Sequence, residues 1–201
     1  MTRLARCVER SRSQLTTFFS IAILPTTSGD YASYLFPLVL LVATPIWTPP
    51  PEDWIKINCD VKVGGDSMCI VALARDLSGA VVWAATSFLN FSDPLIGEAA
   101  ACHLALDTTR LRNHDYVLVE SDSDVVIKAL KGLHYIWNID NYVSLCNQLS
   151  NYFLSCNFSF ISRVCNFAAH NVARWAFAQN FTDVMESSCI PVSILCNDRD
   201  V

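Results

Sequence analysis

A chain of 201 residues, 52% of them apolar, is long enough for one domain of ordinary size plus an appendage and too short for two full domains. Its 14 basic and 19 acidic residues give a formal charge of −5, which excludes a broad cationic surface of the kind that neutralises nucleic-acid phosphates. Any nucleic-acid partner must therefore be held locally or through metal ions.

The N-terminal part of the chain differs in composition from the rest. Four arginines in the first twelve residues precede a short apolar run at 18–24, a pattern typical of targeting peptides. A second apolar run at 34–47 is interrupted by prolines and is shorter than the roughly 20 residues that a membrane-spanning helix needs. We therefore expect residues 1–50 to be a poorly ordered extension that ends in a proline-rich linker, without a membrane span. Organelle targeting stays an open alternative.

Three strands are predicted at the start of the main domain. Residues 54–60 alternate apolar and polar side chains, as a half-buried strand does. The glycines of segment 64–66 provide a turn into an apolar run at 69–74, and Ser78-Gly79 turns the chain into a third run at 80–85. Strands joined by short turns that contain glycine predict an antiparallel meander.

A helix and a strand–turn–helix step follow. Asp93 can cap a helix that has a proline in its first turn and whose apolar residues recur at helical spacing to about Leu111. The run 115–120 is rich in β-branched and aromatic residues and predicts a buried fourth strand. Segment 121–123 then forms a turn into a second helix over 124–131, a step typical of α/β architecture.

Two further helices and one strand complete the predicted domain. A helix is expected over 140–152, a fifth strand over 157–162, and a last helix capped by Asn166. The predicted order of elements is β-β-β-α-β-α-α-β-α. It places a domain at 51–182 and leaves a C-terminal tail at 183–201.

The nine cysteines lie mostly inside apolar runs. Their spacing contains no CxxC pair and no cluster of cysteine and histidine suited to zinc. An odd number of cysteines at such positions favours reduced core residues over a disulfide framework. We therefore expect an intracellular protein, in the nucleus or the cytoplasm.

Three motifs each place a carboxylate on a predicted element. They are Ile57-Asn58-Cys59-Asp60 in the first strand, Gly97-Glu98-Ala99-Ala100-Ala101 in the first helix, and Ser121-Asp122-Ser123 after the fourth strand. Their order and positions resemble the ribonuclease H family. A wider set, from Trp47 with its prolines to the stretch 163–173, resembles plant retroelement-derived ribonuclease H type-1 domains, and this resemblance covers residues 47 to about 180.

The resemblance implies both a fold and an activity. The fold is an α/β ribonuclease H-like fold, with a five-stranded mixed sheet whose first three strands are antiparallel and which is flanked by helices. The activity is metal-dependent hydrolysis of the RNA strand of RNA–DNA hybrids by a nucleic-acid-binding domain. We expect this protein to be a monomer.

The resemblance also assigns Asp60, Glu98 and Asp122 as catalytic metal ligands, for Mg²⁺ or alternatively Mn²⁺. Phosphodiester hydrolysis must activate a water and neutralise charge on both the attacking and leaving oxygens, which two ions roughly 3.5–4 Å apart can do together. Mg²⁺ prefers hard oxygen ligands such as carboxylates. Taken singly, each residue could be an ordinary surface charge. Asp124 competes with Asp122, which we prefer because it occupies the Ser-Asp-Ser position.

The fourth position of the predicted site departs from the family pattern. More complete members have Ala-Asp-x-x-Ala in the last helix, whereas this chain has Ala169-His170-Asn171-Val172-Ala173. His170 is therefore either a residual ligand or acid of the catalytic site, or a histidine on the face of a helix. An imidazole removes a negative charge and suits Zn²⁺ or Mn²⁺ better than Mg²⁺, so the second metal should bind more weakly.

Two residues near the last helix are candidate contacts to nucleic acid. Arg163 and Asn166 could bind phosphate or sugar, although a salt bridge and a helix cap explain them equally well. The substitution at His170 and the acidic charge of the chain also support a second hypothesis. In that case the domain is a catalytically degenerate nucleic-acid-binding or interaction module derived from a retroelement.

Overall fold

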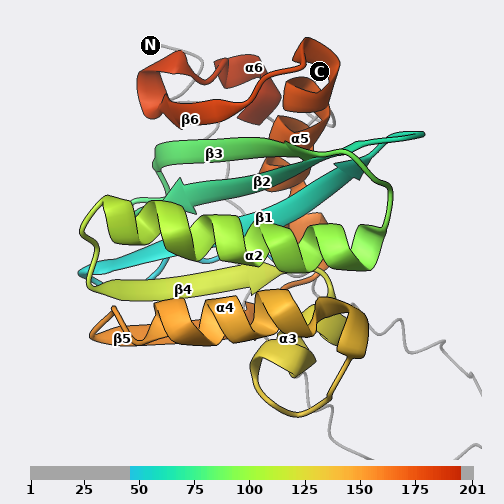
Figure 1. Ribbon diagram of the computed structural model, residues 1–201. Coiled ribbons are helices and arrows are strands. Elements are labelled where there is room, and N and C mark those ends of the chain that lie inside the picture. The colour runs from blue at the N-terminus through green and yellow to red at the C-terminus, as the bar shows by residue number, and fades with distance from the viewer. Residues whose placement is uncertain (1–45, 196–201) are drawn as a thin grey trace, which may run out of the picture. The chain divides into compact units, whose positions relative to one another are not determined.

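A six-stranded mixed sheet lies at the centre of the structure, a computed structural model that describes residues 46–195 (Figure 1). The strands are β1 (Trp54–Val63), β2 (Met68–Arg75), β3 (Val81–Leu89), β4 (Tyr116–Ser121), β5 (Ser155–Phe160) and β6 (Asp183–Glu186). Their order in the sheet is β5-β4-β1-β2-β3-β6. As predicted, the sheet is mixed and its first three strands are antiparallel neighbours. β4 runs parallel to both β1 and β5. Residues 1–45 of the extension predicted at 1–50, with its targeting pattern, lie outside the described residues.

The sixth strand differs from the five-stranded sheet predicted from the sequence. β6 pairs antiparallel with β3, and the hydroxyl of Thr86 donates to the carbonyl of Phe181 at 3.0 Å. Met185 is buried. Residues 183–195, expected to belong to a tail, therefore extend the domain. Only one of the four residues of β6 is buried, so this strand has no apolar run that would reveal it in the sequence.

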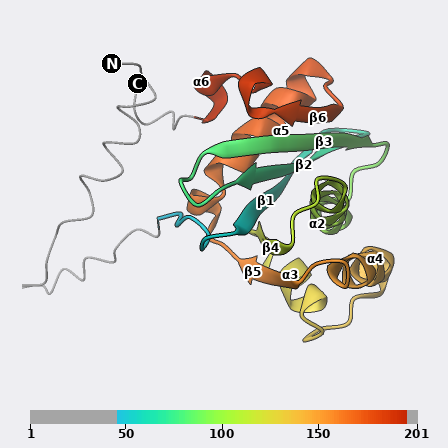
Figure 2. The ribbon, with the colours of Figure 1, turned by 90° about the vertical axis from the view of Figure 1, so that its left-hand side faces the viewer.

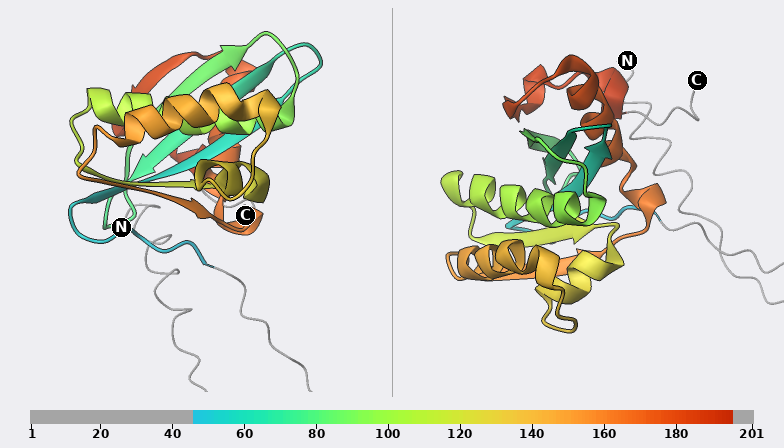
Figure 3. Two further views of the ribbon diagram at one scale, coloured as in Figure 1. Left: turned by 60° about the horizontal axis from the view of Figure 1, so that its bottom comes forward. Right: turned by 45° about the vertical axis from the view of Figure 1, so that its right-hand side comes forward.

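Helices cover both faces of the sheet. α2 (Pro94–Leu111) and α4 (Asp140–Ser150) lie side by side on one face, close to α3 (Asp124–Leu130), and α5 (Phe167–Gln179) packs on the other (Figure 2, Figure 3). Shorter turns of helix are η1 (Trp137–Ile139), η2 (Arg163–Cys165), η3 (Ser187–Cys189) and α6 (Val192–Leu195). The predicted strands and helices are present in the predicted order. No helix within residues 46–195 is long and apolar enough to cross a membrane.

The two faces of β1 carry different side chains, because successive residues of a strand point to opposite faces. Ile57 and Cys59 are fully buried in the core that α2 and α4 cover. Asn58 and Asp60 point to the α5 face, where Val71, the partner of Asp60 on β2, belongs to the core under α5. These polar residues are buried as well, so β1 is buried on both faces at this point and not half-buried as its alternating sequence predicts.

The start of α2 is fixed by a cap and by a close contact with the sheet. The carboxylate of Asp93 accepts hydrogen bonds from two backbone amides of the first turn, at 3.0 and 3.2 Å, which confirms the predicted cap. A Cβ atom on Gly97 would lie 2.8 Å from both the sulfur of Met68 and a methyl group of Val61. Any other residue at position 97 would force Met68 and Val61 to move, so the glycine lets α2 lie this close to the sheet, and the next residue of the helix is Glu98.

Most of the described cysteines are buried thiols of the core. None of the seven within residues 46–195 forms a disulfide, and five of them are buried. Burial raises the pKa of Cys59, so this thiol stays protonated and unreactive at neutral pH. The prediction of reduced core cysteines is confirmed for this part of the chain, whereas Cys7 and Cys196 lie outside it.

Candidate metal centre

β1 and β4 part at the position of two aspartates. The parallel register pairs Cys59 with Ser121, which is the last residue of β4. Asp60 is therefore the first residue of β1 without a neighbour on β4, and Asp122 leaves the end of β4 directly beside it. The carboxylates of two segments far apart in the sequence thus lie next to each other.

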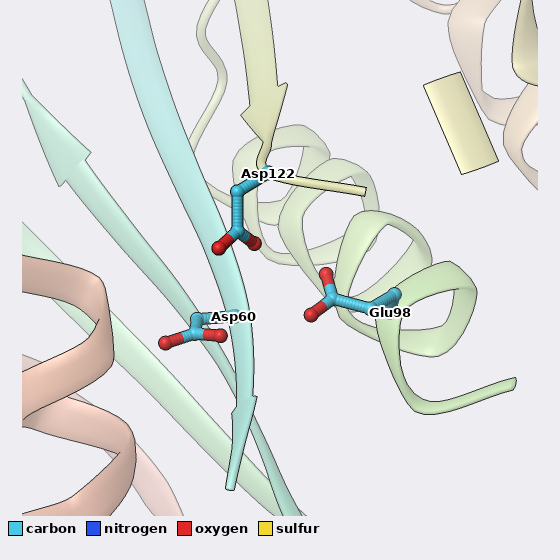
Figure 4. Close-up of side chains that lie close together, drawn as sticks. All are labelled: Asp60, Glu98 and Asp122. Atoms are coloured by element: carbon cyan, nitrogen blue, oxygen red, sulfur yellow. The ribbon is translucent and has the colours of Figure 1, made fainter. Parts of the chain in front are cut away.

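Glu98 completes a cluster of three carboxylates. One oxygen each of Asp60, Glu98 and Asp122 lies within 4.8 Å of the other two. Figure 4 shows Asp60 on β1, Asp122 just after β4 and Glu98 reaching toward them from the N-terminal part of α2. The structure therefore brings together the three residues that the sequence predicts as metal ligands.

Ser121 holds the Glu98 side chain in this cluster. Its hydroxyl donates to Oε2 of Glu98 at 2.9 Å and accepts a hydrogen bond from the backbone amide of Ser123 at 3.0 Å. Asp60 is held in a similar way, because its Oδ1 accepts from the amide of Val61 at 2.8 Å. The role of Ser121 is not evident from the sequence, where the Ser-Asp-Ser motif indicates only a turn and a cap.

Burial of this cluster makes its negative charges costly. Burial, together with the charges of Asp60 and Asp122, raises the pKa of Glu98 to about 8, although the hydrogen bond from Ser121 and the guanidinium of Arg163 oppose this rise. Burial also raises the pKa of Asp60, although a backbone hydrogen bond and His170 oppose this rise. A bound cation favours the charged forms and would relieve the cost. Three convergent carboxylate oxygens therefore fit a hard divalent cation.

His170 lies at the centre and not merely on a helix face. Its Nδ1 is 2.9 Å from Oδ2 of Asp60, and its side chain is half-buried on α5. Asp60 therefore has the other carboxylates on one side and an imidazole on the other. Of the two alternatives left by the sequence, the structure favours a position where His170 orients Asp60 or contributes a nitrogen ligand.

The structure decides between Asp122 and Asp124 and places Arg163. Asp122 lies in the carboxylate cluster, whereas Asp124 forms an ion pair with Lys128 on the surface of α3. Arg163 lies 3.5 Å from Oδ2 of Asp122, and its side chain is 71% exposed. It therefore presents a free face of its guanidinium to solvent at the edge of the centre.

Asn166 differs from both interpretations of its sequence position. It is 1% exposed, which leaves it no surface for a contact to nucleic acid, and its side chain makes no capping hydrogen bond to α5. Instead its Nδ2 donates to the backbone carbonyl of Cys59 at 2.8 Å. Asn166 thus ties the start of α5 to β1 next to Asp60, which brings His170 to the centre.

Several solved structures share this fold, which is that of ribonuclease H. RNase H1 from Halobacterium salinarum aligns with a TM-score of 0.59 and 17% identity, over 63% of this chain and 98% of that one. The N-terminal RNase H domain of a Mycobacterium tuberculosis protein aligns with a TM-score of 0.58 and 16% identity, over 63% and 94%. LC11-RNase H1, from a compost metagenome, was solved with an RNA/DNA hybrid and aligns with a TM-score of 0.57 and 16% identity, over 63% and 98%.

The family itself is identified by the sequence. The sequence profile of the reverse transcriptase-like family matches residues 58–176, so the chain belongs to this family. Comparison with curated protein sequences gives no match. The predicted ribonuclease H-like class is thereby confirmed, while its plant and retroelement origin stays a prediction.

Proposed function

We propose that the domain hydrolyses the RNA strand of RNA–DNA hybrids, with a divalent cation held by Asp60, Glu98 and Asp122. The observation that carries this proposal is the convergence of these carboxylates within 4.8 Å where β1 and β4 part. The family match and the fold shared with LC11-RNase H1, whose structure contains an RNA/DNA hybrid, support it.

The neighbours of the three carboxylates have roles in this reaction. A divalent cation, when bound, activates a water and neutralises charge on the scissile phosphate. Ser121 restrains one oxygen of Glu98, and His170 restrains Oδ2 of Asp60, so both carboxylates are oriented before a cation arrives. Arg163 is exposed beside Asp122 and can bind a substrate phosphate through its guanidinium.

The preferred cation follows from the donor atoms. The three carboxylates suit Mg²⁺, which takes hard oxygen ligands at short distances. His170 places a nitrogen next to Asp60, and Mn²⁺ accepts a nitrogen ligand more readily than Mg²⁺ does. We therefore infer that Mg²⁺ occupies the three-carboxylate position and that Mn²⁺ supports more activity when a second ion is needed.

A binding module without efficient turnover is the second candidate. His170 stands where the resemblance implies a fourth carboxylate, which weakens the case for a second Mg²⁺. Several of the described cations are also paired with acidic neighbours, so they are not free for phosphate: Arg110 with Asp107, Arg112 with Glu186 and Lys128 with Asp124. This candidate predicts binding of nucleic acid without cleavage.

A cleavage assay with the full chain separates the two candidates. We expect the RNA strand of a labelled RNA–DNA hybrid to be cut in the presence of Mg²⁺ or Mn²⁺ and to stay intact when EDTA removes the metal. Duplex DNA of the same sequence is the matched control and should not be cut. Binding of the hybrid with no cleavage in either metal would reject the nuclease and support the binding module.

Metal binding should release a proton near neutral pH. The pKa of Glu98 is about 8 in the metal-free protein, so at pH 7 most of this carboxyl is protonated and must lose its proton to bind a cation. The apparent affinity for Mg²⁺ should rise with pH by up to about tenfold per unit and level off above pH 8. Calorimetric titration in buffers of different ionisation enthalpy measures the released proton. An affinity independent of pH over this range would contradict the raised pKa.

A further inference from the structure

A buried polar cluster lies beside the candidate metal centre and links the same two strands. Lys56, Asn58 and Glu120 are 4%, 0% and 7% exposed although each is charged or polar. Nζ of Lys56 is 3.0 Å from Oε1 of Glu120, and Nδ2 of Asn58 donates to Oε2 of Glu120 at 3.0 Å. Both oxygens of a carboxylate on β4 are thus held by side chains of β1. We call these three residues the polar clamp.

The segment Trp47–Thr48, which precedes the first strand, hydrogen-bonds to two residues of the polar clamp. Nε1 of Trp47 donates to Oδ1 of Asn58 at 3.1 Å, and the carbonyl of Thr48 accepts from Nζ of Lys56 at 2.7 Å. Arg75 also donates to Oδ1 of Asn58, at 2.6 Å, and its guanidinium lies 3.6 Å from the centre of the Trp47 ring. The family match begins at residue 58, and the domain start predicted at residue 51 also excludes this segment. The structure makes it part of the folded unit.

The polar clamp lies immediately before the two aspartates of the centre. Asn58 and Glu120 are directly opposite each other in the β1–β4 register. Asp60 follows Asn58 by two residues, and Asp122 follows Glu120 by two, so the clamp and the aspartates are separated by the last rung of the ladder. Beyond that rung the strands are no longer paired, and the spacing of the two aspartates depends on the rungs before it.

We propose that Asn58 and Glu120 are positioning residues that set the spacing of Asp60 and Asp122, and that Trp47 belongs to the metal-binding unit because it fixes Asn58. This inference rests on the proposed metal-dependent function. Removing a group that hydrogen-bonds to a metal ligand and orients it typically weakens metal affinity by about 10–100-fold. The polar clamp acts on Asp60 and Asp122 through the register of β1 with β4 and not through direct hydrogen bonds, so the lower end of this range applies.

The charges of the polar clamp also favour this role. An unpaired carboxylate at Glu120 would add a fourth negative charge beside the three metal ligands and would disfavour their charged forms. Lys56 forms an ion pair with Glu120, and the guanidinium of Arg75 interacts favourably with the same carboxylate. The negative charge of Glu120 is thus balanced locally, and the centre keeps the charge of its own three carboxylates.

Binding of Mn²⁺ alone to the full chain tests the proposal. Glu120→Gln keeps the shape of the side chain but removes its charge and turns one acceptor toward the Asn58 amide into a donor. It should weaken Mn²⁺ binding about tenfold or more, measured by calorimetry or electron paramagnetic resonance. Trp47→Phe keeps a smaller aromatic ring near Arg75 and removes the donor to Asn58 without changing any charge, and it should weaken binding severalfold.

Two further variants separate positioning from general stability. Ile57→Val removes a methylene from the opposite face of β1, so it should lower the melting temperature and leave the Kd for Mn²⁺ unchanged. The double variant Asn58→Asp with Glu120→Gln restores a carboxylate–amide pair in reverse order, with an acceptor still facing Trp47 and Lys56. It should recover most of the affinity lost in Glu120→Gln.

The outcomes are distinct. An equal Kd for the wild type, Glu120→Gln and Trp47→Phe would overturn the proposal while leaving the metal centre intact. A wild type that binds no Mn²⁺ would overturn both this proposal and the proposed function. If the Kd values for Mn²⁺ follow the expected pattern but the wild type does not cleave the hybrid, the positioning role stands and the proposed reaction is rejected. If Glu120→Gln does not fold, Trp47→Phe decides the question, because it leaves every buried charge in place.

Discussion

Replacing Asp122 with Asn should abolish cleavage of RNA–DNA hybrids, whereas replacing Asp124 with Asn should leave cleavage unchanged. The two substitutions are the same chemical change two residues apart. The side chain of Asp122 is 8% exposed and belongs to the carboxylate cluster, while Asp124 is exposed and paired with Lys128. We expect a loss of at least about 10²–10³-fold at Asp122, the size typical of removing one electrostatic stabiliser of the transition state. An exposed ion pair contributes little, so Asp124→Asn should change the rate less than about twofold.

Initial rates of RNA-strand cleavage at saturating Mn²⁺ measure this difference, with the Kd for Mn²⁺ measured on the same preparations. Cleavage and Mn²⁺ binding should fall together in Asp122→Asn, because an amide is a poorer ligand for a hard cation than a carboxylate. Equal rates for the two variants would remove Asp122 from the site. Lost cleavage with full Mn²⁺ affinity would instead point to Arg163, which lies 3.5 Å from the Asp122 carboxylate.

Elements with strong local signals could be predicted from the sequence. The alternation in β1, the Asp93 cap of α2 and the strand–turn–helix step after β4 each depend on residues close together in the chain, and the structure contains all three. β6 has no such signal. It has four residues, one of them buried, and its partner β3 lies about a hundred residues earlier, so only tertiary pairing defines it.

The candidate site was predictable to the extent that its motifs fall in order on recognisable elements. Asp60, Glu98 and Asp122 were identified in this way, but their convergence depends on the register of β1 with β4. Asn166 shows the limit of local rules. An asparagine before a helix usually caps it, whereas this one donates to the carbonyl of Cys59, a partner that the nearby sequence cannot reveal.

The polar clamp could not be predicted from the sequence, because its burial also depends on residues far away in the chain. Lys56 and Asn58 occupy the polar positions of an alternating strand, a pattern that normally indicates a solvent-exposed face. They are buried because Glu120 on the neighbouring strand and Trp47 from the preceding segment satisfy their hydrogen bonds. Alternation gives the face on which a side chain lies, but what covers that face depends on long-range packing.

Replacing His170 with Asp should raise Mg²⁺-supported cleavage by about tenfold or more. Nδ1 of His170 lies 2.9 Å from Oδ2 of Asp60, so a carboxylate at this position would offer oxygen where the wild type offers nitrogen. Mg²⁺ strongly prefers oxygen, and one added ligand or orienting contact is commonly worth about 10–100-fold in metal affinity. His134→Asp is the matched control, since it changes the same residue type at an exposed position in the connection between α3 and α4.

The same substitution should have opposite effects on stability with and without metal. In the absence of metal it removes the contact of His170 with Asp60 and adds a like charge, which raises the pKa of Asp60 further and lowers the Tm. A tighter site gains more stability from a given Mg²⁺ concentration, because binding stabilises the folded state by RT ln(1 + [L]/Kd). The rise in Tm on adding Mg²⁺ should therefore be larger in His170→Asp than in the wild type.

Rate and Tm together locate the defect of the wild type. A larger rise in Tm with an unchanged Mg²⁺-supported rate would mean that the substitution improves the cation site while substrate binding limits cleavage. Arg163 would then be the next residue to vary, because it is the exposed cation beside Asp122. An unchanged rise in Tm would show that residue 170 is not at a ligand position, and His170 would then act only by orienting Asp60.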